Sequence, residues 1–142
     1  MKYLLDTDHI SFLQRRSGPE YSPLALNIAR HSPEDLAFSI ISFHEQVIGA
    51  HAYINQGRTT ADAIRGYTLL WEILQGFTAA PVLPFDAAAA AILDGLRAQR
   101  IRVPAMDLRI AAIALSRGLI LLTRNTRDFG RVPGLVIEDW TL

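Results

Sequence analysis

The chain has 142 residues, half of them apolar, which is the usual size of one domain with a single hydrophobic core, so we expect one domain over residues 1–142. Because there is no cysteine, disulfides and thiolate metal ligands are excluded, and a metal would have to bind oxygen or imidazole. Fourteen acidic residues balance fourteen basic ones, so the net charge gives no argument for nonspecific binding to nucleic acid.

The N-terminus does not fit a secretory signal, because it carries one lysine and only a very short apolar run before Asp6. No apolar stretch approaches about 18 residues, the lower range for a membrane-spanning helix. From the sequence we therefore expect a soluble, cytoplasmic protein without a membrane contact.

Five short apolar runs predict β-strands, and helical patterns separate all of them except the last two. This alternation is typical of an α/β fold, with a mostly parallel central sheet of about five strands flanked by helices. The predicted strands are Tyr3–Leu5, Leu36–Ile41, Pro81–Leu83, Leu119–Leu122 and Leu135–Ile137.

Proline, glycine and capping residues mark the ends of the predicted helices. The first helix follows Asp6 directly. The others run from Ser22 toward His31, from Ser42 to about Gln56, onward from Thr59, from Asp86 to about Arg100, and from Pro104 to Gly118.

The helix after Thr59 carries one apolar stripe at helical spacing, which predicts a buried face or a helix–helix interface. Together with the preceding helix it offers more hydrophobic surface than one small sheet needs, and an exposed groove there could receive a partner helix. The stripe consists of Ile64, Tyr67, Trp71 and Leu74.

Three carboxylates, Asp6, Glu45 and Asp107, stand where an apolar run gives way to a helix. Ligands of open α/β sheets bind at the carboxyl ends of strands, so these positions predict a shared acidic cluster. Each also has a purely structural interpretation. Asp6 or Asp8 could cap the next helix, Glu45 could form a capping box with Ser42, and Asp107 could stabilise a helix dipole.

A polar turn after the fourth predicted strand adds an amide at Asn125 and a carboxylate at Asp128. In the structural interpretation, Asn125 or Thr126 only caps that turn. In the functional one, oxygen ligands converge at one edge of the sheet, which suits Mg²⁺ or Mn²⁺ and needs no histidine.

Arginine accounts for thirteen of the fourteen basic residues, and several arginines lie near the acidic positions. A guanidinium group binds phosphate or carboxylate in a bidentate fashion, although charged runs are often only solvated faces. The arginines next to the candidate site are Arg109, Arg124 and Arg127.

Five motifs occur in the order and spacing of one family, although no single motif is specific. With these motifs the chain resembles the PIN-domain ribonucleases, and most closely the VapC-type toxins of bacterial toxin-antitoxin pairs, along essentially its whole length. The motifs are Leu4-Leu5-Asp6-Thr7, Ser42-x-x-Glu45, Asp107-x-x-Ile110-Ala111-Ala112, Leu122-Thr123-Arg124-Asn125 with Asp128-Phe129, and Val132-Pro133-Gly134-Leu135 followed by Glu138-Asp139-Trp140.

The resemblance implies a metal-dependent endoribonuclease in which Asp6, Glu45 and Asp107 hold Mg²⁺ or Mn²⁺. Arg109, Arg124 and Arg127 would hold the RNA backbone. It also implies a homodimer and a cognate VapB-type antitoxin that neutralises the toxin. One residue departs from the pattern: Asn125 stands where many members have a fourth acid, which weakens a second metal site unless Asp128 substitutes.

Two alternatives stay open from the sequence. Asp6-Thr7-Asp8 also resembles the nucleophile motif of haloacid-dehalogenase-like phosphatases, but these need a lysine near the site, and the only lysine, Lys2, lies at the far end of the first strand. The other alternative is a PIN fold that has lost catalysis and serves as an RNA- or antitoxin-binding module, for which Asn125 is the motive.

Overall fold

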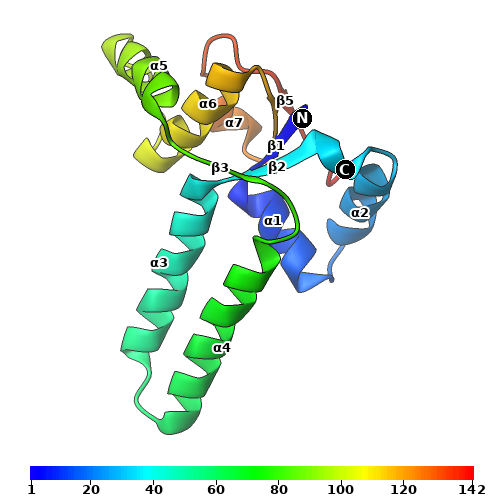
Figure 1. Cartoon of the computed structure of the whole chain (residues 1–142), viewed down its shortest axis with the longest axis vertical. Helices are drawn as coiled ribbons and strands as arrows, with labels where there is room; N and C mark the ends of the chain where they lie inside the picture. The colour runs from blue at the N-terminus through cyan, green and yellow to red at the C-terminus, as the bar shows by residue number, and fades with distance from the viewer.

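Five short parallel strands form one sheet in the order β3-β2-β1-β4-β5, with helices on both faces (Figure 1). The structure is a computed structural model that describes residues 1–142. The predicted α/β class with a parallel sheet of about five strands is confirmed. The strands are β1 (Tyr3–Leu5), β2 (Leu36–Ser39), β3 (Val82–Leu83), β4 (Ile120–Leu122) and β5 (Ile137–Glu138).

Seven α-helices and one short 3₁₀ helix connect these strands. Long helices separate β1, β2, β3 and β4, as parallel strands require, because each crossover must return to the same end of the sheet. They are α1 (Thr7–Arg15), α2 (Tyr21–Ala29), η1 (Pro33–Asp35), α3 (Ile40–Gln56), α4 (Thr60–Gly76), α5 (Ala87–Ala98), α6 (Ala105–Arg117) and α7 (Thr126–Phe129).

Two local predictions are wrong. The third α-helix begins at Ile40, and its N-cap is Ser39, whose hydroxyl accepts from the Ser42 backbone N–H at 3.0 Å. Ser42 therefore lies inside the first turn, and Glu45 is not part of a capping box. The last two strands are also separated by a short helix, α7, where the sequence predicted no helix.

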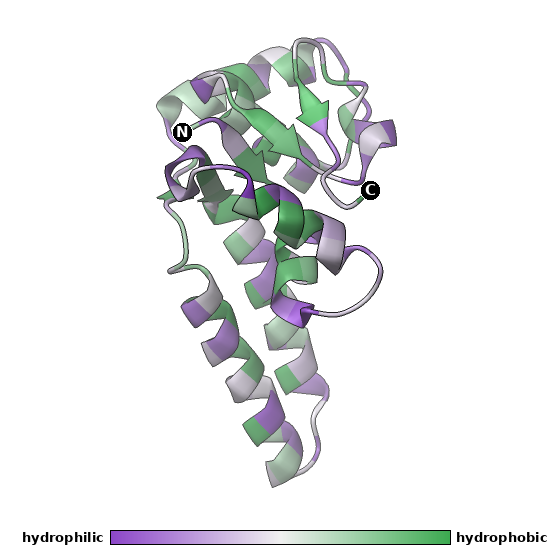
Figure 2. Cartoon of the chain, turned by 90° about the vertical axis from the view of Figure 1, so that its right-hand side faces the viewer, coloured by the Kyte–Doolittle hydropathy of each residue, from purple (hydrophilic) through white to green (hydrophobic).

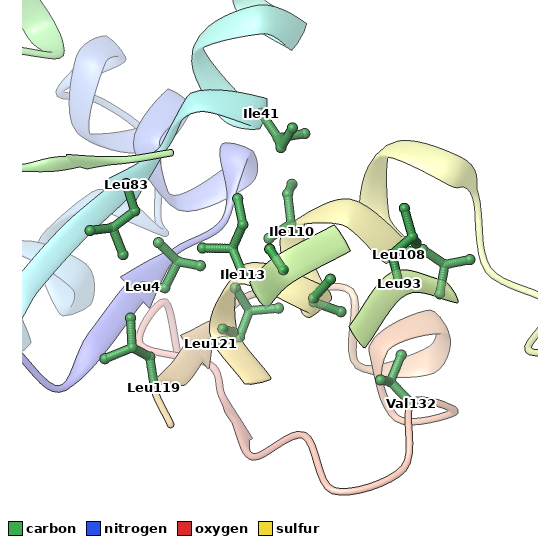
Figure 3. Close-up of a cluster of buried hydrophobic side chains, with 14 of the residues drawn as sticks. Leu4, Ile41, Leu83, Leu93, Leu108, Ile110, Ile113, Leu119, Leu121 and Val132 are labelled. Atoms are coloured by element: carbon green, nitrogen blue, oxygen red, sulfur yellow. The ribbon is translucent and has the colours of Figure 1, made fainter. Parts of the chain in front are cut away.

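The sheet has a hydrophobic core on each face because successive side chains of a strand point to opposite sides. Leu4 faces the cluster formed with α5 and α6, and Figure 3 shows it near Ile113 and Leu121. Tyr3 and Leu5 face the other cluster, formed with the helices α1 to α4. In Figure 2 the strands are accordingly mostly in the green of hydrophobic residues.

The hairpin of α3 and α4 extends well beyond the sheet (Figure 1). Its two helices approach closely at Gly66, where an added Cβ would lie 2.5 Å from Cγ1 of Ile54. The predicted apolar stripe on α4 is not in the core: Trp71 is 61 % exposed, and the other three members are exposed as well. No helix in the structure is both long enough and apolar enough to span a membrane.

Candidate active site

Asp6 is the first residue after β1, at the carboxyl edge of the sheet, and it is 5 % exposed. Its extended backbone makes it the N-cap of α1, and Oδ1 accepts from the Thr7 backbone N–H at 2.8 Å. Oδ2 accepts from the Thr123 hydroxyl at 2.7 Å. The predicted capping interpretation is thus correct, but it uses only one of the two carboxylate oxygens.

The neighbouring parallel strand explains the Thr123 contact. Leu5 pairs with Leu122, so the residues that follow them, Asp6 and Thr123, lie side by side. Burial, and then the charge of Asp8, raise the pKa of Asp6 to about 7, against the lowering effect of these two hydrogen bonds.

Glu45 lies on the second turn of α3, which begins directly after β2. The Thr7 hydroxyl donates to Glu45 Oε1 at 2.9 Å and lies 2.9 Å from Ser42 Oγ. Because Thr7 adjoins Asp6, this contact brings the start of α3 against the start of α1.

Asp107 lies in the first turn of α6, which runs back along the sheet before β4 and therefore starts at the carboxyl edge. Desolvation, and then the negative charges of Glu45, Asp128 and Asp8, raise the pKa of Asp107 to about 6. Asp107 in turn raises the pKa of Asp6, so four other carboxylates lie within electrostatic reach of Asp107.

Asp8 belongs to this acidic group, although the resemblance to PIN-domain ribonucleases assigned it no role. Its Oδ1 lies 2.7 Å from His9 Nδ1, and its Oδ2 accepts from the Arg124 backbone N–H at 2.9 Å. The available signal was the repeated acid in Asp6-Thr7-Asp8. Thr7 and Thr123 were also missed, and only the pairing of β1 with β4 reveals the second of them.

Asn125 and Asp128 pair with each other. Asn125 is the N-cap of α7, its Oδ1 accepts from the Asp128 backbone N–H at 3.3 Å, and its amide donates to Asp128 Oδ2 at 3.1 Å. This is the capped turn of the structural interpretation. Asp128 nevertheless faces the cluster closely enough to raise the pKa of Asp107.

The three candidate arginines differ in their surroundings. Arg109 is half-buried and contacts the sulfur of Met106 at 3.3 Å. Arg124 is exposed, pairs with Glu20 at 3.3 Å and places its guanidinium over the Phe12 ring. Arg127 is exposed on α7.

The donor chemistry of the cluster suits a hard divalent cation. Asp6, Glu45 and Asp107 form no ion pair with any lysine, arginine or histidine. Buried or half-buried carboxylates without a cationic partner are costly, and a bound metal ion removes that cost. The side chains are not preset for coordination, since no three acidic or histidine side chains converge tightly enough to hold a metal as they lie.

A family model described as PIN domain matches residues 3–135. The chain belongs to the PIN-domain family. It is also 46 % identical over 147 residues to the tRNA(fMet)-specific endonuclease VapC of Shigella flexneri, with 99 % of both chains covered. The protein is therefore a VapC ribonuclease toxin of the VapBC type, as its motifs predict.

Solved structures agree with this assignment. The DNA-bound VapBC complex of Salmonella typhimurium contains a chain that is 30 % identical, with a TM-score of 0.73 over 99 % of this chain and 98 % of that one. VapBC-1 of nontypeable Haemophilus influenzae is 26 % identical, with a TM-score of 0.77 over the whole of both chains. The phosphatase alternative fails, because Lys2 precedes β1 and lies at the opposite edge of the sheet from Asp6.

Proposed function

We propose that this PIN domain, over residues 1–142, is a metal-dependent endoribonuclease in which Asp6, Glu45 and Asp107 hold Mg²⁺ or Mn²⁺. The observation that carries the proposal is their convergence from the starts of three helices onto one edge of the sheet, without a cationic partner. A bound divalent cation supplies a Lewis acid that stabilises the charge developing on the phosphodiester oxygens.

The residues of the chain divide the remaining work. Thr123 and Thr7 orient Asp6 and Glu45 by donating hydrogen bonds to them. Asp128, held by Asn125, supplies further negative charge on the side of Asp107. A water molecule attacks phosphorus, the bond to the leaving oxygen breaks, and a carboxylate of the cluster accepts the proton of the water.

Arginines at the rim would hold the RNA backbone. Arg127 and Arg124 are exposed beside the acidic edge, and Arg109 is on the same helix as Asp107. Guanidinium groups bind phosphate oxygens and offset the repulsion between RNA and a cluster of carboxylates. We infer that they position the strand and do not choose its sequence.

We propose tRNA(fMet) as the substrate, because the Shigella flexneri relative carries that specificity in its name and covers the chain end to end. RNA of this kind is found in the cytoplasm, where we expect the protein to act.

For the partner, we propose a cognate VapB-type antitoxin, because similar chains occur in VapBC complexes. Its apolar segment would occupy the groove of about 660 Å³ that α1 and α4 line with Leu13, Leu69 and Trp71. We expect the toxin itself to form a homodimer.

The test is cleavage of total cellular RNA and of tRNA(fMet) by antitoxin-free protein, in Mg²⁺, in Mn²⁺ and in excess EDTA, with Asp6→Asn as the matched control. Discrete fragments that require both the metal and Asp6 support the proposal. Metal-independent cleavage, or equal cleavage by Asp6→Asn, contradicts it.

One observation favours a second candidate, a PIN fold without catalysis that binds RNA or an antitoxin. Asn125 stands where a fourth acid would add a metal ligand, and its side-chain amide donates a hydrogen bond to Asp128. Folded protein that binds Mn²⁺ and RNA but leaves the RNA intact would establish this alternative.

A further inference from the structure

His9 is the one histidine with no exposed surface, and both of its ring nitrogens have partners. The backbone N–H of Trp140 lies 3.2 Å from Nε2. Because a backbone N–H can only donate, Nε2 accepts, and the ring proton is on Nδ1. Nδ1 therefore donates to Asp8 Oδ1, and the two atoms are 2.7 Å apart. His9 thus connects the last strand region to the acidic edge.

The hydrogen bond from His9 leaves Asp8 with little freedom. Asp8 Oδ1 is engaged by His9, and Oδ2 accepts from the Arg124 backbone N–H and lies 3.4 Å from the Thr123 hydroxyl. The same hydroxyl donates to Asp6. With both oxygens engaged, the Asp8 carboxylate is held in one position beside Asp6, and its lone pairs are mostly used inside the protein.

The anchor of His9 is itself rigid. The Trp140 ring stacks on His31 with centroids 4.4 Å apart, its Nε1 donates to Glu138 at 3.1 Å, and its carbonyl accepts from Asn27 at 3.1 Å. Contacts to α2 and to β5 therefore fix the backbone N–H that holds the imidazole in place.

We propose that His9 is a positioning residue for the metal site: by donating to Asp8 and accepting from Trp140, it holds the Asp8 carboxylate against the Asp6–Thr123 pair. His9 does not bind the metal, because neither nitrogen is free. This inference rests on the proposed nuclease function. Groups that orient a metal site from behind its ligands change metal affinity or activity by about 10- to 100-fold when they are removed.

Two substitutions separate the two bonds of the ring. In His9→Asn the side-chain amide occupies the place of Nδ1 and still donates to Asp8. In His9→Gln the amide oxygen reaches the place of Nε2 and accepts from Trp140, but the donor to Asp8 is lost. His51→Asn is the control, because His51 is exposed and contacts only Asn55.

The readouts are the Kd for Mn²⁺ by calorimetry, which needs no catalysis, and kcat and KM for RNA. We expect His9→Gln to weaken Mn²⁺ binding about 10- to 100-fold and to lower kcat, with KM little changed. His9→Asn keeps the donor to Asp8 but loses the bond to Trp140, so its loss of Mn²⁺ affinity should be clearly smaller than that of His9→Gln, and His51→Asn should keep the parent's Mn²⁺ affinity and kcat. Parental Mn²⁺ affinity in folded His9→Gln overturns the proposal, and so does equal loss in the two His9 variants.

A double-mutant cycle tests whether His9 acts through Asp8. In an Asp8→Asn background, His9→Gln should cause no further loss, and a full additional loss overturns the proposal. If neither His9 variant folds, Asp8→Asn alone must show the weakened Mn²⁺ binding, and parental affinity in it overturns the proposal. A parent that neither binds Mn²⁺ nor cleaves RNA contradicts the nuclease function, which is a separate outcome from parental behaviour in His9→Gln.

Discussion

The hydroxyl of Thr123 donates a 2.7 Å hydrogen bond to Oδ2 of Asp6, across 117 positions of sequence. It also accepts from the Asn125 backbone N–H at 3.0 Å. One side chain at the end of β4 therefore orients the most buried carboxylate and fixes the turn that carries Asn125 and Asp128.

Removing that hydroxyl should impair the site. In Thr123→Val, Asp6 loses a bond that lowers its pKa, so the pKa rises further and Mn²⁺ binds more weakly at pH 7. The Asn125 N–H also loses its acceptor, which costs roughly 1–3 kcal/mol of unfolding free energy if it stays unsatisfied. Thr123→Ser retains the hydroxyl and should keep parental affinity. Mn²⁺ titration and thermal melts check both variants. A Thr123→Val protein with the parent's Mn²⁺ affinity and melting temperature would contradict this account.

Asp6→Asn should separate activity from stability. It should abolish cleavage, since it removes a charge from the proposed metal site, yet raise the melting temperature in EDTA at pH 7.5. The reason is that the pKa of Asp6 is about 7, so much of its population is ionised there, buried beside Asp8. The amide retains an oxygen for the Thr7 N–H and an N–H for Thr123. A lower melting temperature in EDTA would show that the carboxylate stabilises the fold without metal.

Stability should depend on pH through the same group. Its pKa is raised from 3.8 to about 7 by burial, so between these pH values the folded state holds a proton that the unfolded state has released. The stabilisation is fully present below about pH 4 and is lost as the pH rises through 7. The melting temperature of the parent minus that of Asp6→Asn, both measured in EDTA, should therefore become more negative as the pH rises over this range. Saturating Mn²⁺ should reverse the trend, and a pH-independent difference would contradict it.

Glu45→Gln should lose activity without losing stability. Glu45 does not cap α3, and a glutamine oxygen still accepts from the Thr7 hydroxyl. Its matched control is Ser39→Ala, which removes the N-cap and costs about 1 kcal/mol of unfolding free energy while leaving the acidic cluster in place. Glu45→Gln should lose RNA cleavage and keep the parent's melting temperature, whereas Ser39→Ala should lower the melting temperature and keep cleavage. A large drop in melting temperature for Glu45→Gln would restore a structural role for this residue.

Trp71→Ala should weaken binding of a co-expressed cognate antitoxin and leave the toxin's melting temperature unchanged, because Trp71 is 61 % exposed and lines the groove. Val136→Ala, also at an exposed apolar residue, is the control and should keep parental affinity. Competition binding with the tagged antitoxin measures both. Equal affinities for Trp71→Ala and the parent would place the partner elsewhere.

The sequence was sufficient where local chemistry decides the structure. The run Tyr3–Leu5 followed by Asp6 predicts a buried strand and a cap, and Gly118 ends α6 with a φ of 63°. The start of α3 depends on a distant partner instead: Ser39 still pairs with Leu83 in the sheet, so the helix begins at the next residue, Ile40, and Ser39 becomes the cap. A sequence that offers two serines cannot decide between them by itself.

The missed site residues depend on long-range contacts in the same way. Asp8 and His9 receive their partners from Arg124 and Trp140, more than a hundred positions away, and no periodicity predicts such pairs. The exposure of the α4 stripe has another cause. Its pattern indicates an apolar face correctly, but a pattern does not say whether the chain or another molecule covers that face.

The dependence of β1 and α1 on residues 123–140 has a consequence for synthesis. A chain leaves the ribosome from its N-terminus, so Asp6, Asp8 and His9 emerge long before Thr123 and Trp140. Until those late residues are in place, Asp6 lacks the hydrogen bond from the Thr123 hydroxyl, and the His9 ring that contacts Asp8 lacks its bond to the Trp140 backbone. We therefore expect a nascent or prematurely terminated chain, which lacks these contacts, to be inactive as a nuclease.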